Sequence, residues 1–381
     1  MKKYKYLDKP LLFLTIALLV FGLIMVFSAS NVTAYMTYNK IPYYYFIKQL
    51  IFVLLGIIGF FIITNMNTKS LGAFSYILIF VFGSLLVYLL VSNKVTAQNN
   101  ALSWISIGPI NIQPSEFIKV VTIFWLAYYY ERHIKGLNNW ATVLFPMFIC
   151  GVIALLIILQ PDLGTAIIYT TIVVAIFLSV PLSKKISFIM RTMIISLILL
   201  IVLLVSTGGI NKLLNDRQSS RITGFKDPCS NLLTTGNQVC NAYIAINNGG
   251  IDGVGLGKST QKYLYLPEAY TDFIFAIIVE ELGLVTGILL LILYMVLLYR
   301  ILKIGRASPN NRGATICYGT ATYIFIHIVV NLMGILGMMP MTGVPLPFMS
   351  YGGSFMICLI ASIAAVQRVS IENHKYKNKR A

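Results

Sequence analysis

Long apolar runs separated by short polar segments make up most of the chain. Each run is close to or above the roughly 20 residues that a helix needs to cross the hydrocarbon core of a bilayer. Ten runs can be delimited, at residues 10–29, 46–65, 73–92, 112–130, 142–160, 163–182, 187–206, 273–299, 314–338 and 346–367. A helix satisfies all of its backbone polar groups internally, as lipid requires. The pattern therefore predicts an all-α polytopic membrane protein with ten transmembrane helices.

The basic residues follow the positive-inside rule across these runs. With the N-terminus in the cytoplasm, the inner segments and the C-terminal tail hold 18 of the 29 Lys and Arg residues. The short outer segments hold little beyond Lys40, Lys48 and Lys94. Both termini are therefore predicted to be cytoplasmic. The first run is expected to stay as an uncleaved span, because it is too long for a signal peptide and further spans follow.

Composition excludes a soluble enzyme. The chain is 58% hydrophobic and 11% charged, whereas a soluble domain carries about 25% charged residues. The net charge of +17 could suggest nucleic acid. The basic residues, however, flank the apolar runs, where membrane orientation requires them. We therefore expect membrane lipid, and no nucleic acid, among the partners.

One polar segment, residues 207–272, is far longer than the others and lies on the predicted outer side. We expect a single membrane domain, residues 1–381, with this segment as a large extracellular loop between the seventh and eighth helices. Its six basic residues are Lys212, Arg217, Arg221, Lys226, Lys258 and Lys262. Two interpretations are open: they bind an anionic ligand such as a phosphate-bearing lipid, or they are solvated charges balanced by the carboxylates of the loop.

The cysteines fall into two groups. Cys229 and Cys240 share the outer loop, where an oxidising exterior permits a disulfide; bonded and free states are both open. The others, Cys150, Cys317 and Cys358, lie within predicted spans and are expected to be small core residues. No cysteine and histidine cluster has the spacing of a metal site.

A glycine-rich segment at 253–259 looks at first like a phosphate-binding loop. The ATP-binding pattern needs a glycine five positions before Gly257, and Asp252 stands there. ATP binding is therefore rejected.

Polar residues inside or beside spans are costly in lipid and are functional candidates by default. Glu116 and Lys119 lie one helical turn apart and can pair. Asp162 follows Pro161 at an outer turn, where it is either functional or an N-cap. Glu280 either has a function or pairs with a basic residue on a neighbouring helix. His327 and Asn331 are expected to be interhelical hydrogen-bonding residues.

Asp272 stands where the long loop meets the eighth run. A carboxylate at such a boundary is partly desolvated, which favours general-base chemistry, and it can meet both a water-side acceptor and a lipid-anchored donor. The alternative is an N-cap role for Thr271 or Asp272.

The segment 339–354 holds three prolines and several glycines, so it cannot form a regular helix. Irregular backbone at membrane depth survives only when it is buried in protein or lines a cavity. We therefore expect a polar cavity that opens toward the outer leaflet.

Several segments together resemble the family of shape, elongation, division and sporulation proteins, the FtsW/RodA group. They are residues 25–30, Trp104–Gly108, Gln113–Glu116, Gln160–Thr165, Gln261–Lys262, Leu266–Phe275 and 345–354. The resemblance covers nearly the whole chain, and the segments occur in the order and topology of the family.

The resemblance implies an inverting peptidoglycan glycosyltransferase of the bacterial cytoplasmic membrane. It would polymerise lipid II on the outer face, release undecaprenyl diphosphate, and work with a class B penicillin-binding transpeptidase and other division proteins. The essential aspartate of the family corresponds to Asp272. Candidate substrate contacts are Trp104, Glu116, Lys119, Asp162, Lys258, Gln261, Lys262, Glu268, Ser350, Gly352 and Gly353. The leaving diphosphate needs positive charge from Lys119, from the loop, or from Mg²⁺ or Mn²⁺.

Within the family, residues 261–269 resemble the septal, cell-division branch more than the elongation branch, which remains the alternative. Two residues depart from the family pattern: Tyr270 stands where many members have histidine, and Ser103 where many have arginine. Two other functions are open. A lipid II flippase would need polar groups on both sides of the bilayer, and a division scaffold would tolerate loss of Asp272.

Overall fold

The computed structural model describes residues 5–92, 103–108, 110–192, 196, 228–229 and 236–380. Ten α-helices, one short 3₁₀ helix (η2) and one two-stranded hairpin are delimited in this part, and residues 184–192 are also helical. The elements are α1 (Lys9–Met36), α2 (Tyr44–Asn65), α3 (Thr68–Val91), β1 (Ile105–Ile107), β2 (Ile110–Ile112), α4 (Pro114–Arg132), η2 (Ile134–Gly136), α5 (Trp140–Leu159), α6 (Leu163–Ser179), α9 (Gly236–Gly249), α10 (Ile274–Arg306), α11 (Asn311–Ile335) and α12 (Gly353–Arg380). The prediction of an all-helical polytopic membrane protein is confirmed.

Nine of the ten predicted spans coincide with described helices. The run at 187–206 is helical as far as residue 192, and most of the remainder lies outside the described residues. The last run differs: α12 begins at Gly353 rather than at 346, because Pro345 and Pro347 cannot continue a helix. The count of ten spans and the side on which each terminus lies stay predictions.

Seven of the described helices are long and apolar enough to span a membrane on their own. Helix α4 is not among them, because it carries Glu116, Lys119, Glu131 and Arg132. It is buried on nearly every side and packs against α3, α6, α11 and α12. Its charges are therefore shielded from lipid by protein, which hydropathy along the sequence does not register.

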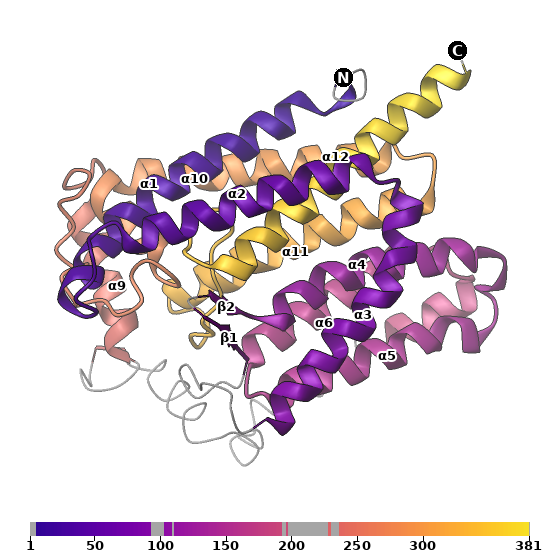
Figure 1. Cartoon of the computed structure of the whole chain (residues 1–381), viewed down its shortest axis with the longest axis horizontal. Coiled ribbons are helices and arrows are strands. Elements are labelled where there is room, and N and C mark those ends of the chain that lie inside the picture. Colours follow the sequence, from indigo (N-terminus) through magenta and orange to yellow (C-terminus); the bar gives the residue numbers. More distant parts are fainter. Residues whose placement is uncertain are drawn as a thin grey trace.

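Helices α1, α2, α10 and α12 run side by side on one flank of the bundle, and α3, α5 and α6 surround α4 on the other (Figure 1). The start of α1 and the end of α12 lie at one end of the molecule (Figure 1). Helix α9 and the β-hairpin lie toward the opposite end (Figure 1).

Ionic and amide contacts tie the helices together at the end that holds the chain termini. Arg312 on α11 binds the Glu131 carboxylate on α4 and, through Nε, the hydroxyl of Thr68 at 2.9 Å. Thr68 in turn donates through its amide and its hydroxyl to Glu372 on α12, at 2.9 and 2.6 Å. One network therefore joins α3, α4, α11 and α12.

Helix α10 is broken at Gly283, whose φ of 81° lies in the left-handed region. The break leaves two backbone carbonyls of α10 without a donor from the helix itself. Backbone N–H groups of the loop after α9 donate to these carbonyls instead. Val254 N–H donates to Glu280 O and Gly255 N–H to Glu281 O, both at 2.9 Å. A Cβ at position 283 would lie 2.1 Å from Ile251 O. Only glycine lets the loop and the helix approach this closely.

Candidate active site

Asp272 lies two residues before α10 and is half-buried. Its backbone is held by Asn331 of α11, whose Nδ2 donates to Asp272 O at 2.7 Å and to Val344 O at 2.8 Å. A Cβ at Gly343 would lie 3.4 Å from Asp272 Oδ2. The carboxylate therefore faces the irregular segment that precedes α12. The N-cap position of α10 is Phe273, so neither Thr271 nor Asp272 occupies it as the alternative predicted.

Asp162 caps α6. Its Oδ1 accepts from Thr165 N–H at 3.0 Å and its Oδ2 from the Thr165 hydroxyl at 2.9 Å, which confirms the N-cap interpretation. Gln113 Nε2 also donates to Asp162, at 3.3 Å. A Cβ at Gly164 would lie 2.9 Å from Thr342 O. The segment Thr342–Gly343 is therefore in contact with the start of α6 and with the carboxylate of Asp272.

Ser350 connects the segment before α12 to the backbone that leads to Asp272. Its hydroxyl accepts from Leu346 N–H at 2.7 Å and donates to Thr271 O at 2.6 Å. The side chain is buried. Beside it, Tyr351 N–H donates to Tyr270 O at 2.9 Å. Ser350 thus positions the chain on which Asp272 lies, and direct contact with a ligand remains a prediction for it.

The glycines after Ser350 allow close packing against α2. Gly352 N–H donates to Gln49 Oε1 at 3.1 Å, and Gln49 Nε2 donates to Ser350 O at 3.2 Å. A Cβ at Gly353 would lie 2.5 Å from the ring of Phe52. Gly353 therefore serves the fit of α12 against α2, and Gly352 bonds α2 through its backbone.

The β-hairpin docks on the same region. Gln113, which follows β2, donates its N–H to Ser354 Oγ of α12 at 3.0 Å. Ile105 pairs with Ile112 and Ile107 with Ile110 in antiparallel register. Trp104 lies directly before β1 and is half-buried. Hydrophobic patterning did not predict this hairpin, because its strands are only three residues long.

Three tyrosines form a cluster next to Asp272 that the sequence did not reveal. The ring centroid of Tyr45 lies 4.6 Å from that of Tyr270 and 5.1 Å from that of Tyr351. Burial, and secondarily a side-chain hydrogen bond with Tyr45, raise the pKa of Tyr270 above its ordinary value, so the phenol stays neutral. The run of tyrosines at 43–45 in the sequence was the available signal.

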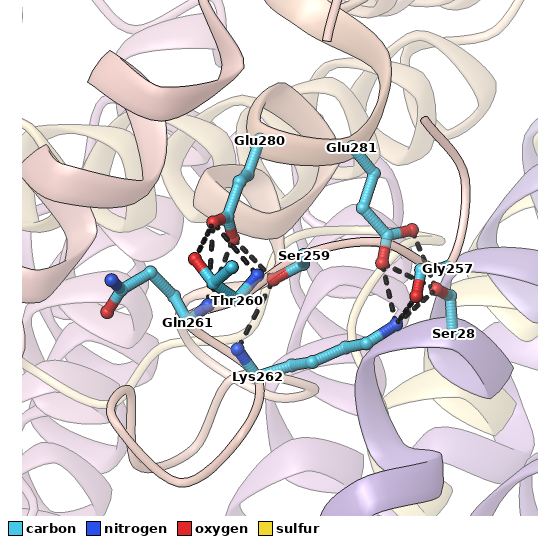
Figure 2. A network of polar contacts seen from close by, with 8 residues as sticks. All are labelled: Ser28, Gly257, Ser259, Thr260, Gln261, Lys262, Glu280 and Glu281. Carbon is cyan, nitrogen blue, oxygen red and sulfur yellow. Dashed lines mark hydrogen bonds and ion pairs between the residues drawn. The ribbon is translucent and has the colours of Figure 1, made fainter. Parts of the chain in front are cut away.

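A second polar network lies where the outer loop meets the broken helix α10 (Figure 2). Lys262 Nζ binds Glu281 Oε1 at 2.9 Å and Gly257 O at 2.7 Å, and the Ser28 hydroxyl donates to Glu281 Oε2 at 2.6 Å. Lys262 and Glu281 are both buried. This network joins α1, the loop and α10. Lys262 is therefore held in a structural ion pair, and the substrate contact expected of it stays a prediction.

Glu280 makes a separate set of contacts (Figure 2). Its carboxylate accepts from the hydroxyl of Ser259, and from the N–H and hydroxyl of Thr260 at 3.1 and 2.9 Å. It pairs with no basic side chain among these contacts, so the predicted pairing with a neighbouring helix is wrong. The adjacent residue, Glu281, forms the ion pair instead. Gln261 is buried in the same turn, whereas Lys258 is exposed.

Glu116 and Lys119 pair at 2.8 Å inside the bundle, as predicted. His327 Nδ1 donates to Tyr323 O at 2.7 Å, so Nε2 accepts from Lys119 Nζ at 3.1 Å. The expected interhelical hydrogen bonding of His327 is thus confirmed. Lys119 is buried, and its ammonium group bonds both Glu116 and His327.

Glu268 is exposed and accepts from the Thr271 hydroxyl at 2.9 Å, one turn before Asp272. Cys229 and Cys240 are joined by a disulfide, with their Cα atoms 5.1 Å apart. The three other cysteines are buried, as expected of small core residues.

A preformed metal site is not found in the described part of the chain, where no three His, Cys, Asp or Glu side chains gather closely enough to hold an ion. The residues near Asp272 therefore do not by themselves provide the ligand set for Mg²⁺ or Mn²⁺.

The fold and the site define a class of protein: a polytopic helical membrane protein with a carboxylate held beside an irregular segment at one end of the bundle. The family model for FtsW, RodA and SpoVE, described as cell cycle protein, matches residues 9–375. The chain belongs to this family.

Curated relatives match over nearly full length. Stage V sporulation protein E of Bacillus subtilis is 34% identical over 95% of this chain and 96% of its own. The probable peptidoglycan glycosyltransferase FtsW of the same organism is 34% identical over 99% of this chain and 94% of its own.

Solved structures agree in fold. The Rod shape determining protein RodA of Thermus thermophilus is 25% identical, with a TM-score of 0.64 over 97% of each chain. A chain from a study of how a peptidoglycan synthase complex coordinates polymerization and crosslinking is 26% identical, with a TM-score of 0.76 over 97% of this chain and 99% of its own.

Proposed function

We propose that this protein is a peptidoglycan glycosyltransferase that polymerises lipid II at the outer face of the bacterial cytoplasmic membrane. The observation that carries the proposal is the placement of Asp272. Its carboxylate faces an irregular segment and its backbone is fixed by Asn331. The name of one B. subtilis relative, probable peptidoglycan glycosyltransferase FtsW, supplies the reaction class.

Asp272 acts as general base in the proposed reaction. Its carboxylate accepts the proton of the 4-hydroxyl of the acceptor sugar, and that oxygen bonds to the anomeric carbon of the donor. The bond from this carbon to the diphosphate oxygen breaks, and its electron pair leaves with undecaprenyl diphosphate. Attack opposite to the leaving group turns the α-linked donor into a β-1,4 linkage with inversion.

The departing diphosphate needs cationic stabilisation. Of the three lysines predicted to contact substrate, Lys119 and Lys262 are held in buried ion pairs. Lys258 is exposed on the outer loop and is the one of the three whose charge can approach a ligand from solvent. Lys212, Arg217, Arg221 and Lys226 lie outside the described residues.

Polymerisation of fluorescent lipid II by the purified full-length protein, together with its cognate class B transpeptidase, tests the proposal. We expect glycan ladders from the native protein and a loss of rate of at least a hundredfold in Asp272→Asn, the scale on which a general base acts. Asp252→Asn is the matched control, because Asp252 is an exposed carboxylate of the same loop. Equal rates for the native protein and Asp272→Asn would refute the role of Asp272.

We further propose that the protein works in septal cell-wall synthesis with a class B penicillin-binding partner and other division proteins. Residues 261–269 and the FtsW relatives support the division branch. Depletion in the source bacterium discriminates the branches. Filamentous cells are expected for a division enzyme, whereas rounded cells would assign the protein to elongation.

A further inference from the structure

A cavity lies far from Asp272, at the end of the bundle that holds the chain termini. Its volume is about 140 Å³. It is half-open, and it is lined by Asp8 before α1, by the last turns of α10 and by the C-terminal part of α12. Its lining residues are Asp8, Arg300, Lys303, Ile304, Ala307, Ser370, Asn373, His374 and Lys377. The positive-inside pattern assigns this end to the cytoplasm, so the cavity lies near the headgroups of the inner leaflet.

The walls of the cavity are fixed by hydrogen bonds between distant parts of the chain. Asp8 Oδ2 binds Arg300 at 2.6 Å. Gln367 exchanges two hydrogen bonds with the backbone of Asp8, at 2.8 and 2.9 Å. Asn373 Nδ2 donates to Ile304 O at 3.0 Å. The three helices are therefore held at a set distance, and the cavity is a built feature of the fold.

The lining has an excess of positive charge. Arg300, Lys303 and Lys377 contribute three cations, against the single carboxylate of Asp8. Lys303 and Lys377 are exposed and can turn toward a ligand, whereas Arg300 is anchored by Asp8. A cavity with a net positive charge at the membrane surface attracts anionic ligands.

Two buried polar atoms of the lining residues have no hydrogen-bond partner within the described chain: Arg300 Nε, a donor, and Asn373 Oδ1, an acceptor. A buried polar atom left unpaired costs about 1–3 kcal/mol, so each such atom calls for an explanation. Both atoms are shielded from solvent in this conformation, so a ligand reaches them after the two side chains turn toward the cavity. An anionic oxygen then satisfies the guanidinium, and a hydroxyl group satisfies the amide oxygen. A ligand that carries both groups satisfies both atoms.

We propose that this cavity binds a phosphate ester that carries a free hydroxyl group, supplied by the glycerol phosphate headgroup of an anionic phospholipid in the inner leaflet. Basic pockets between membrane helices on the cytoplasmic side bind such headgroups. The phosphate lies against Arg300, Lys303 and Lys377, and a headgroup hydroxyl donates to Asn373. The lipid joins the first helix of the chain to the last, at the opposite end from the proposed catalytic site, and the proposal does not depend on the proposed enzymatic function.

The test uses the full-length protein purified in detergent and titrated with dioctanoyl phosphatidylglycerol, with the rise in melting temperature as the readout of binding. The cavity variant is Lys303→Gln/Lys377→Gln. The control is Arg306→Gln/Lys375→Gln, which removes the same charge from exposed positions of the same two helices outside the cavity. We expect saturable binding that is about tenfold weaker in the cavity variant, and nearly unchanged in the control.

Four further probes assign the chemistry. Dioctanoyl phosphatidylmethanol has the same charge without the headgroup hydroxyls, and we expect it to bind about fivefold more weakly, the scale of one hydrogen bond. Dioctanoyl phosphatidylcholine should not saturate the site. Glycerol 3-phosphate and inorganic phosphate distinguish the source. Competition by glycerol 3-phosphate at equal affinity would support the site but assign it to a soluble phosphate ester, and equal competition by inorganic phosphate would refute the role of the headgroup hydroxyl.

Two results would overturn the proposal. Equal weakening in the cavity variant and the control would mean that general surface charge, and not the cavity, attracts the lipid. Equal affinity for phosphatidylcholine and phosphatidylglycerol would mean that the acyl chains alone bind. Far-ultraviolet circular dichroism of each variant establishes that it is folded before it is titrated.

Discussion

At the scale of single residues, the site is organised by side chains that hold backbone rather than by side chains that face solvent. Asn331 and Ser350 each bond the chain that leads to Asp272, and each also bonds the segment before α12. General-base chemistry depends on the placement of the base to within a few tenths of an ångström. These two residues are therefore positioning residues for Asp272.

Replacing Asn331 tests this role. Asn331→Ala removes both hydrogen bonds, to Asp272 O and to Val344 O. We expect the rate of lipid II polymerisation to fall by about ten- to a hundredfold, since misplacing a catalytic group by 1 Å can cost about a hundredfold. Ser75→Ala is the control, because it removes a buried side-chain hydrogen bond on α3, outside both proposed sites. If both variants lose activity equally, Asn331 acts only through stability.

The buried ion pair of Lys262 gives a prediction about stability. Lys262→Met leaves Glu281 without its cation in the interior, and we expect the free energy of unfolding to fall by about 3–5 kcal/mol. Lys258→Met, at an exposed position four residues earlier, should cost less than about 0.5 kcal/mol. Thermal denaturation in detergent measures both. A Lys262→Met/Glu281→Met variant should recover part of the loss, because it removes the unpaired charge.

At the scale of elements, the break in α10 decides how the outer loop is held. The helix resumes after Gly283 with Leu284 N–H donating to Gly250 O at 3.0 Å. The loop therefore completes the backbone hydrogen bonding of the interrupted helix. The carboxylates of Glu280 and Glu281, just before the break, then anchor residues 259–262 of the same loop. An uninterrupted helix would leave this loop without its backbone partners.

Gly283→Ala tests the break. A Cβ there would meet Ile251 O at 2.1 Å, at a φ of 81° that side chains rarely adopt. Strain and overpacking together should lower the free energy of unfolding by about 3 kcal/mol. In Gly83→Ala on α3 nothing lies within 4 Å of the new Cβ, so the melting temperature should stay level or rise slightly. Similar melting temperatures for the two variants would contradict the close approach of loop and helix.

At the scale of the whole molecule, the two ends of the bundle have different chemistry. One end holds Asp272, the tyrosine cluster and the loop anchored on α10. The other holds the chain termini, the network around Arg312 and Glu372, and the basic cavity. This polarity agrees with a protein that reacts with a substrate on one face of a membrane and is anchored on the other.

Labelling of single cysteines tests the predicted sidedness. Lys258→Cys and Lys375→Cys both place a thiol at an exposed position, at opposite ends of the molecule. In intact cells an impermeant maleimide should label position 258, and position 375 only after permeabilisation. The native protein is the background control, since Cys150, Cys317 and Cys358 are buried and Cys229 is bonded to Cys240. Labelling of position 375 in intact cells would reverse the topology.

The sequence by itself determined the place of most described helices, because a membrane span needs a long apolar run. It also singled out Asp272, the Glu116–Lys119 pair and the irregular segment before α12, each from local chemistry. Only the tertiary structure decided which partners the polar residues take. That Glu281 rather than Glu280 meets Lys262, that Asn331 holds Asp272, and that Tyr45 joins Tyr270 all depend on contacts between segments far apart in the chain. Such contacts follow from how helices pack against each other, and apolar periodicity within one segment contains no information about its neighbour.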